Sequence, residues 1–217
     1  QPMYAMQPVG LDGVTEPLDS VPEMAARYLD ELREVQPSGP YRLVGNCFGG
    51  VVALEMAGML EAAGAQVELV TVVDGAMPLH PARPQPVVVR AAAVYRKRGA
   101  MGLLRKVRAH VTTRLRPVGS PREDPRPVDA VSAVRQGIAR AFLTYEPKPV
   151  AAPVLLIRSS RHQLLGEGYD WGTQWGEYTP SFTEVTVDGQ KQDMFSTPNV
   201  ESLAAIIRAH TDVIGED

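Results

Sequence analysis

The chain has 217 residues, 44% of them apolar, and a formal net charge of −3, which fits one globular domain with a sizeable core and argues against nucleic-acid binding. Its single cysteine excludes an internal disulfide and a multi-cysteine metal site, as suits a reducing cytoplasm. No apolar run is long enough to cross a bilayer, and the N-terminus lacks the form of a signal peptide, so we expect no membrane association and a cytoplasmic protein.

Two elements are expected before residue 40. Residues 3–8 have the composition of a short buried strand, ended by turn signals at Gly10 and Gly13. Residues 20–23 (Ser-Val-Pro-Glu) have the capping-box pattern with a proline in the first turn, which predicts the start of a helix. Apolar residues then recur every three or four positions, which gives the helix one face for packing on a sheet.

Residues 41–60 predict a strand, a tight turn and a helix. The turn carries Gly45-Asn-Cys47-Phe48-Gly49, which has the G-x-nucleophile-x-G form of a nucleophile elbow, with cysteine where serine is usual. We expect side chains at Gly45 and Gly49 to collide with neighbouring backbone, and the helix N-terminus to favour the Cys47 thiolate. The N–H of Phe48 would face a developing oxyanion. The alternative is a buried, inert cysteine on a glycine-rich turn.

Gly64 should close this helix, and residues 67–73 form a continuous β-branched run, typical of a parallel strand covered on both faces. Asp74 follows directly. Because the carboxyl ends of parallel strands line the ligand crevice, Asp74 is a candidate catalytic acid that could reach the elbow. A strand-end aspartate is otherwise a common turn or cap residue.

Residues 77–149 depart from the alternation of strand and helix and include helical patterns at 87–95, 101–115 and 131–143. Residues 83–126 contain about a dozen Arg or Lys and only two acids, Glu123 and Asp124. Such a segment could steer an acidic partner, or it could be an ordinary solvated helix face.

Two further strands are expected, at residues 153–159 and 182–187. Between them, residues 166–176 with Trp171 and Trp175 should form a surface connection whose tryptophans pack at the sheet edge.

Three stretches carry a family resemblance: Met3-Tyr-Ala-Met-Gln-Pro-Val-Gly-Leu-Asp-Gly, Ser20-Val-Pro-Glu-Met-Ala-Ala-Arg-Tyr, and Gln36-Pro-Ser-Gly-Pro-Tyr-Arg-Leu-Val-Gly-Asn-Cys-Phe-Gly-Gly. Over nearly its whole length the chain resembles the thioesterase domains that end nonribosomal peptide and polyketide synthetases. The resemblance implies one α/β-hydrolase domain over residues 1–217, with a helical lid at 77–149. It also implies that the nucleophile receives an acyl or peptidyl chain from carrier-protein phosphopantetheine, and that Asp74 is the triad acid.

The sequence departs from the family in two places. Gly189, Met194, Pro198 and Val200 keep register with the family pattern, which puts Lys191 where the catalytic histidine is expected. The family also has a strand and loop that supply a second oxyanion donor, and their position lies before residue 1. Either the sequence is part of a longer domain or another group completes the oxyanion hole. We expect the first, because a missing central strand would leave buried backbone groups unpaired.

These departures shape the expected mechanism. Cysteine can be acylated with little help, whereas water needs a base to release the acyl group. Lys191 could act as that base only if desolvation favoured its neutral form, and a nearby Asp74 carboxylate would oppose this. We therefore expect release by acyl transfer or cyclisation, with aminolysis favoured over hydrolysis. His162, in the loop after residues 153–159, is the alternative base, while His80, His110 and His210 are weaker candidates.

Two other functions stay open: a hydrolase that clears misprimed carrier proteins, and a catalytically inactive domain that binds a carrier. The four histidines are dispersed and no metal-ligand spacing occurs, so no metal is predicted. Neither a Walker motif nor a G-x-G-x-x-G pattern supports nucleotide binding, and no bound cofactor is expected.

Overall fold

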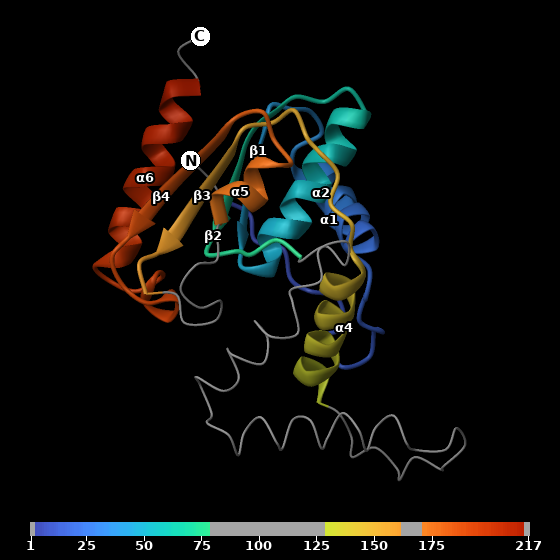
Figure 1. Cartoon of the computed structure of the whole chain (residues 1–217). Helices are drawn as coiled ribbons and strands as arrows, with labels where there is room; N and C mark the ends of the chain where they lie inside the picture. Colours follow the sequence, from blue (N-terminus) through green and yellow to red (C-terminus); the bar gives the residue numbers. More distant parts are fainter. Residues whose placement is uncertain (1–2, 79–128, 162–170, 215–217) are drawn as a thin grey trace, which may run out of the picture. The chain divides into compact units, whose positions relative to one another are not determined.

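Four parallel strands form the sheet in the computed structural model, which describes residues 3–78, 129–161 and 171–214. The strands lie side by side in chain order (Figure 1). They are β1 (Tyr41–Asn46), β2 (Val67–Val73), β3 (Val154–Ser159) and β4 (Phe182–Val187). All three strand pairs are parallel, so the carboxyl ends of the strands meet at one edge. The parallel sheet expected from the sequence is confirmed.

Helices cover both faces of this sheet (Figure 1). On one face lie α1 (Val21–Val35) and α2 (Phe48–Ala62), joined by residues of α4 (Ala130–Thr144) and α5 (Trp171–Gly176). On the other face lies α6 (Asn199–Ile214), which follows the short 3-10 helix η1 (Lys191–Asp193). In β2, Val70 and Val72 join the first core while Leu69 and Val73 join the second. This two-residue period explains why the strand is apolar throughout.

The expected helix after residue 20 is confirmed, but its capping box is not. Ser20 has the extended backbone of an N-cap, and its side chain makes no capping hydrogen bond. Pro22, at the second position, has no N–H to offer, and the Ser20 hydroxyl does not bind the N–H of Glu23 at the third position either. Glu23 still places a carboxylate in the first turn, where the helix dipole favours it.

The expected buried strand at residues 3–8 was wrong. These residues form no strand, and Met3 and Tyr4 are 78% and 61% exposed. The apolar pattern was right for a strand, but a strand needs a neighbour to pair with, and the sheet formed by the described residues starts at β1.

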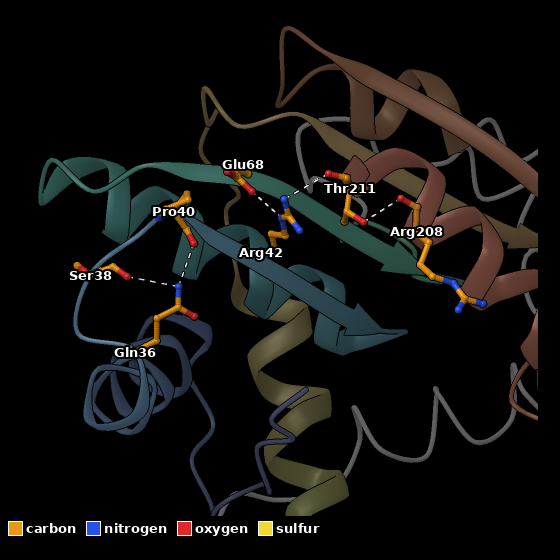
Figure 2. Close-up of polar contacts among 7 residues, drawn as sticks. All are labelled: Gln36, Ser38, Pro40, Arg42, Glu68, Arg208 and Thr211. Carbon is orange, nitrogen blue, oxygen red and sulfur yellow. Dashed lines mark hydrogen bonds and ion pairs between the residues drawn. The ribbon is translucent and has the colours of Figure 1, made fainter. Parts of the chain in front are cut away.

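Polar contacts tie the C-terminal helix to the first two strands (Figure 2). The half-buried Arg42 of β1 forms an ion pair with Glu68 of β2. The same guanidinium donates to the main-chain oxygen of Thr211 on α6 at 3.3 Å. On the approach to β1, the Gln36 amide donates to the carbonyl of Pro40 at 2.9 Å and closes the loop after α1.

Residues 171–176 correct the expectation of a surface connection. They form α5, and Trp175 is fully buried in the core beside α1 and α2. Of residues 77–149, the helix expected at 131–143 is confirmed as α4. The helices expected at 87–95 and 101–115 lie outside the described residues, and the lid as a whole stays a prediction.

Candidate active site

Cys47 lies at the junction of β1 and α2, as the elbow motif predicts. Its backbone has a positive φ of 54° with ψ −120°, a conformation that is uncommon for a residue with a side chain and is found preferentially at functional sites. Its N–H donates to the Val73 carbonyl at 2.8 Å, and its own carbonyl accepts from the N–H of Gly50 at 3.1 Å. The cysteine is thus fixed to the neighbouring strand on one side and to the first turn of α2 on the other. It is half-buried and carries a free thiol.

The two glycines of the motif differ in what they permit. A Cβ at Gly45 would lie 2.2 Å from the main-chain oxygen of Gly49, so a side chain there must displace backbone. A Cβ at Gly49 meets nothing within 4 Å, and the expected collision at that position was wrong. The first glycine lets the helix pack back against its own strand, whereas the second lies on an open side of the helix start.

Gly75 brings the end of β2 against the elbow. A Cβ on Gly75 would lie 2.5 Å from the Cys47 carbonyl oxygen. The indole N–H of Trp175 donates to the Gly75 carbonyl at 2.9 Å, so a buried side chain from α5 anchors this close approach. This role of Gly75 was not predicted from the sequence, although a glycine directly after a strand-end aspartate was a visible signal.

Asp74 follows β2 and is 1% exposed. Its carboxylate accepts the N–H of Ser159 at 2.9 Å and the Ser159 hydroxyl at 3.0 Å to each oxygen. Its N–H donates to the Ile157 carbonyl at 2.8 Å, and its φ is 52°. Asp74 is therefore held against the end of β3. Ser159 was not predicted as a site residue, although its place at the carboxyl end of a parallel strand was the available signal.

Lys191 is carried by the turn that follows β4. The Ser160 hydroxyl donates to the Asp188 carboxylate at 2.7 Å and accepts the N–H of Gly189 at 3.2 Å, which joins this turn to the end of β3. The Ser160 hydroxyl, followed by the Arg161 guanidinium, lowers the pKa of Asp188 below its ordinary value. Gly189 has φ 134°, which favours glycine. The turn thus has a defined path, and Lys191 follows as the first residue of η1.

Cys47, Asp74 and Lys191 each follow the carboxyl end of a strand, and so lie along one edge of the sheet. The Lys191 amine donates to the main-chain oxygen of Asp74 at 3.0 Å, and Cys47 is hydrogen-bonded to Val73, the residue before Asp74. Of the candidate histidines, His162, His80 and His110 lie outside the described residues. His210 contacts the Ile206 carbonyl of its own helix, α6, through Nδ1 at 2.8 Å.

Phe48, the predicted oxyanion donor, is the first residue of α2, where helix N–H groups lack an intrahelical partner. Its ring packs edge-to-face against Phe142 of α4, with centroids 6.1 Å apart. This contact places α4 beside the elbow. It was not expected from the sequence, because nothing local to residue 142 identifies its partner.

Within residues 3–78, 129–161 and 171–214, no three His, Cys, Asp or Glu side chains are grouped so as to hold a metal ion. In the same part of the chain, no helix has the length and apolar character that crossing a membrane requires.

Comparisons with known proteins agree on one family. The family model described as the thioesterase domain matches residues 1–211. The chain is 49% identical over 74 residues to malpibaldin synthetase of Mortierella alpina, and 44% identical over 73 residues to a probable non-canonical nonribosomal peptide synthetase, CymA, of Salinispora arenicola. Each alignment covers 34% of this chain and 1% of the relative, so the chain spans a very small part of either synthetase.

A solved structure extends the likeness to the fold. The NocB thioesterase domain, in covalent complex with a fluorophosphonate nocardicin G analog, aligns with 95% of this chain and 81% of its own. The TM-score is 0.64 and the identity 24%. At that identity the likeness establishes the α/β-hydrolase fold, and the chemistry depends on the residues at the site.

Proposed function

Because the chain belongs to the thioesterase domain family, of the type found in nonribosomal peptide synthetases, we propose that Cys47 takes an acyl or peptidyl chain from carrier-protein phosphopantetheine and passes it to an amine. The observation that carries this proposal is the positive φ of Cys47 at the β1–α2 junction, with the Lys191 amine bound at the end of the adjoining strand. The carrier protein, its phosphopantetheine arm and a cytoplasmic location belong to the same proposal.

In the first step the Cys47 thiolate attacks the thioester carbonyl carbon. The carbonyl oxygen gains negative charge, and the N–H of Phe48 at the helix start is the proposed donor to it. Collapse of this intermediate breaks the bond to the pantetheine sulfur, which leaves as a thiolate and takes up a proton. The acyl group is then held by Cys47 as a new thioester.

In the second step a neutral amine attacks the Cys47 thioester. An amide forms and the bond between the acyl carbon and the Cys47 sulfur breaks. The attacking nitrogen loses a proton, and the released Cys47 thiolate takes up a proton. Attack by water requires a base that accepts a proton, whereas a lysine ammonium has three donors and no acceptor. The lysine in place of histidine therefore supports acyl transfer or cyclisation over hydrolysis.

Intact-protein mass spectrometry with an acyl-pantetheine surrogate tests the first step. We expect the parent to gain the mass of the acyl group and Cys47→Ala to gain none. An equal adduct on Cys47→Ala would place the acylation elsewhere. Retained binding of a carrier protein without any adduct on the parent would favour the inactive, carrier-binding alternative.

The second step is tested by the fate of the adduct in water and with added amine. We expect the acyl-Cys47 mass to persist in buffer and to disappear as an amide product forms. Fast release as free acid, little affected by amine, would overturn the preference for aminolysis and favour the editing hydrolase.

A further inference from the structure

In the part of the chain that the structure describes, two residues other than glycine have a positive φ, and they lie on neighbouring strand ends. Cys47 has φ 54° and Asp74 has φ 52°. Cys47 follows β1 and Asp74 follows β2, and these strands pair with Asn46 opposite Val73. Such conformations cost free energy and persist only where surrounding contacts hold them. The contacts that hold Asp74 are therefore informative.

Hydrogen bonds with two residues of β3 hold Asp74 in place. Its N–H is bound by the Ile157 carbonyl, and its carboxylate is bound by the N–H and the hydroxyl of Ser159. The main-chain oxygen of the same residue accepts the Lys191 amine at 3.0 Å. Ser159 thus binds the side-chain carboxylate of Asp74, while Lys191 binds the main-chain oxygen of the same residue.

We propose that Ser159 is a positioning residue for this site: by holding the Asp74 carboxylate, it fixes the positive-φ backbone that presents the Asp74 carbonyl to Lys191. Ser159 is fully buried, and both of its donors converge on this one carboxylate. The inference rests on the proposed function and gives Lys191 a donor's role in it: the lysine amine stabilises the oxygen of the Cys47 thioester as the amine attacks, and Ser159 holds the lysine in place through Asp74.

A buried hydroxyl can instead serve folding alone, and the chain offers such a case. Thr179 is buried, and its hydroxyl donates to the Ala152 carbonyl at 2.7 Å. Ala152 precedes β3, so this bond lies at the opposite end of that strand from Ser159. Thr179→Val, which removes the hydroxyl and keeps the shape, is the matched control.

The test measures the rate at which an added amine releases the acyl group from Cys47, in single and double variants. We expect Ser159→Ala to slow release about tenfold in the parent and less than twofold in a Lys191→Met background, because the serine acts through the lysine. Thr179→Val should change the rate less than twofold in both backgrounds. Equal slowing by Ser159→Ala in both backgrounds would overturn the inference and leave Ser159 a structural role.

A second pair guards against misfolding of Ser159→Ala. Ser159→Thr keeps the hydroxyl, while Ser159→Val has nearly the same shape without it. We expect Ser159→Thr to release within threefold of the parent and Ser159→Val about tenfold more slowly. Equal rates in the two variants would refute a role for the hydroxyl. The Cys47 adduct is measured in the same samples, so failure of acylation in the parent would instead reject the proposed function.

Discussion

The side-chain amine of Lys191 lies 3.0 Å from the main-chain oxygen of Asp74 and donates a hydrogen bond to it. Lys191 follows β4, at the place where the family resemblance predicts a histidine, and its amine contacts Asp74 at the end of β2. A neutral imidazole has both a donor and an acceptor, whereas a lysine ammonium offers donors alone. The substitution keeps a polar group at the site and removes a ready proton acceptor.

Lys191→His should restore part of the missing base function. We expect hydrolysis of the Cys47 adduct to rise at least tenfold, since a positioned general base typically contributes 10²–10⁴-fold and a new imidazole is imperfectly placed. Release of free acid and of amide from one adduct preparation measures the partition. Lys191→Met, which keeps a long unbranched side chain, is the control and should stay slow in water. If Lys191→His hydrolyses no faster than Lys191→Met, the absence of a base is not what limits release.

Residues close in sequence predicted much of the fold and part of the site. The strand, turn and helix around Cys47 were predictable because the motif and the apolar periods agree there, and Asp74 followed from its place at a strand end. Ser159 and Phe142 were not, because each acts through a partner more than 80 residues away, and local patterns carry no such information. The strand predicted at residues 3–8 was wrong for a related reason, because a strand forms only where a neighbouring strand pairs with it.

The two motif glycines should respond oppositely to alanine. Gly45→Ala places a methyl group 2.2 Å from a main-chain oxygen and should cost on the order of 3 kcal/mol in the free energy of unfolding. Gly49→Ala meets open space in the first turn of α2, and alanine is the better helix former, so stability should be unchanged or rise by up to about 1 kcal/mol. Urea unfolding of both variants measures the two changes in the free energy of unfolding. A similar loss in both would show that the helix start does not have the packing described.

Phe142 should stabilise the elbow, although its side chain is only partly buried. Removing its ring deletes an edge-to-face contact with Phe48, which is worth about 0.5–1.5 kcal/mol beyond burial. We expect Phe142→Ala to lower the free energy of unfolding by about 1–2 kcal/mol and to slow acylation of Cys47, because the Phe48 N–H loses its support. Leu143→Ala changes the adjacent residue, which is 80% exposed, and should cost less than about 0.5 kcal/mol. Unchanged acylation in Phe142→Ala would argue that α4 does not support the elbow.

Tyr145 provides a prediction about pH that is independent of the active site. Its hydroxyl donates to the Glu55 carboxylate at 2.6 Å, and burial first, then this carboxylate, raises the tyrosine pKa above its ordinary value of 10.0. A group whose pKa is raised on folding contributes stability in full below its unfolded pKa and loses it as the pH rises above that value. We therefore expect the free energy of unfolding of the parent to fall above about pH 10, by at most about 1.4 kcal/mol per pH unit from this group.

Tyr145→Phe removes the titrating hydroxyl, so its stability should fall less steeply above pH 10. At pH 7 the variant should be less stable by about 1–2 kcal/mol, because the Glu55 carboxylate loses a hydrogen-bond donor. Tyr4→Phe is the control, since Tyr4 is 61% exposed, and its pH dependence should match the parent. Tyr28 and Tyr178 also have raised pKa values, and they titrate in all three proteins, so the difference between variants isolates Tyr145. Identical slopes for the parent and Tyr145→Phe would mean that the hydroxyl is not held in the buried contact with Glu55.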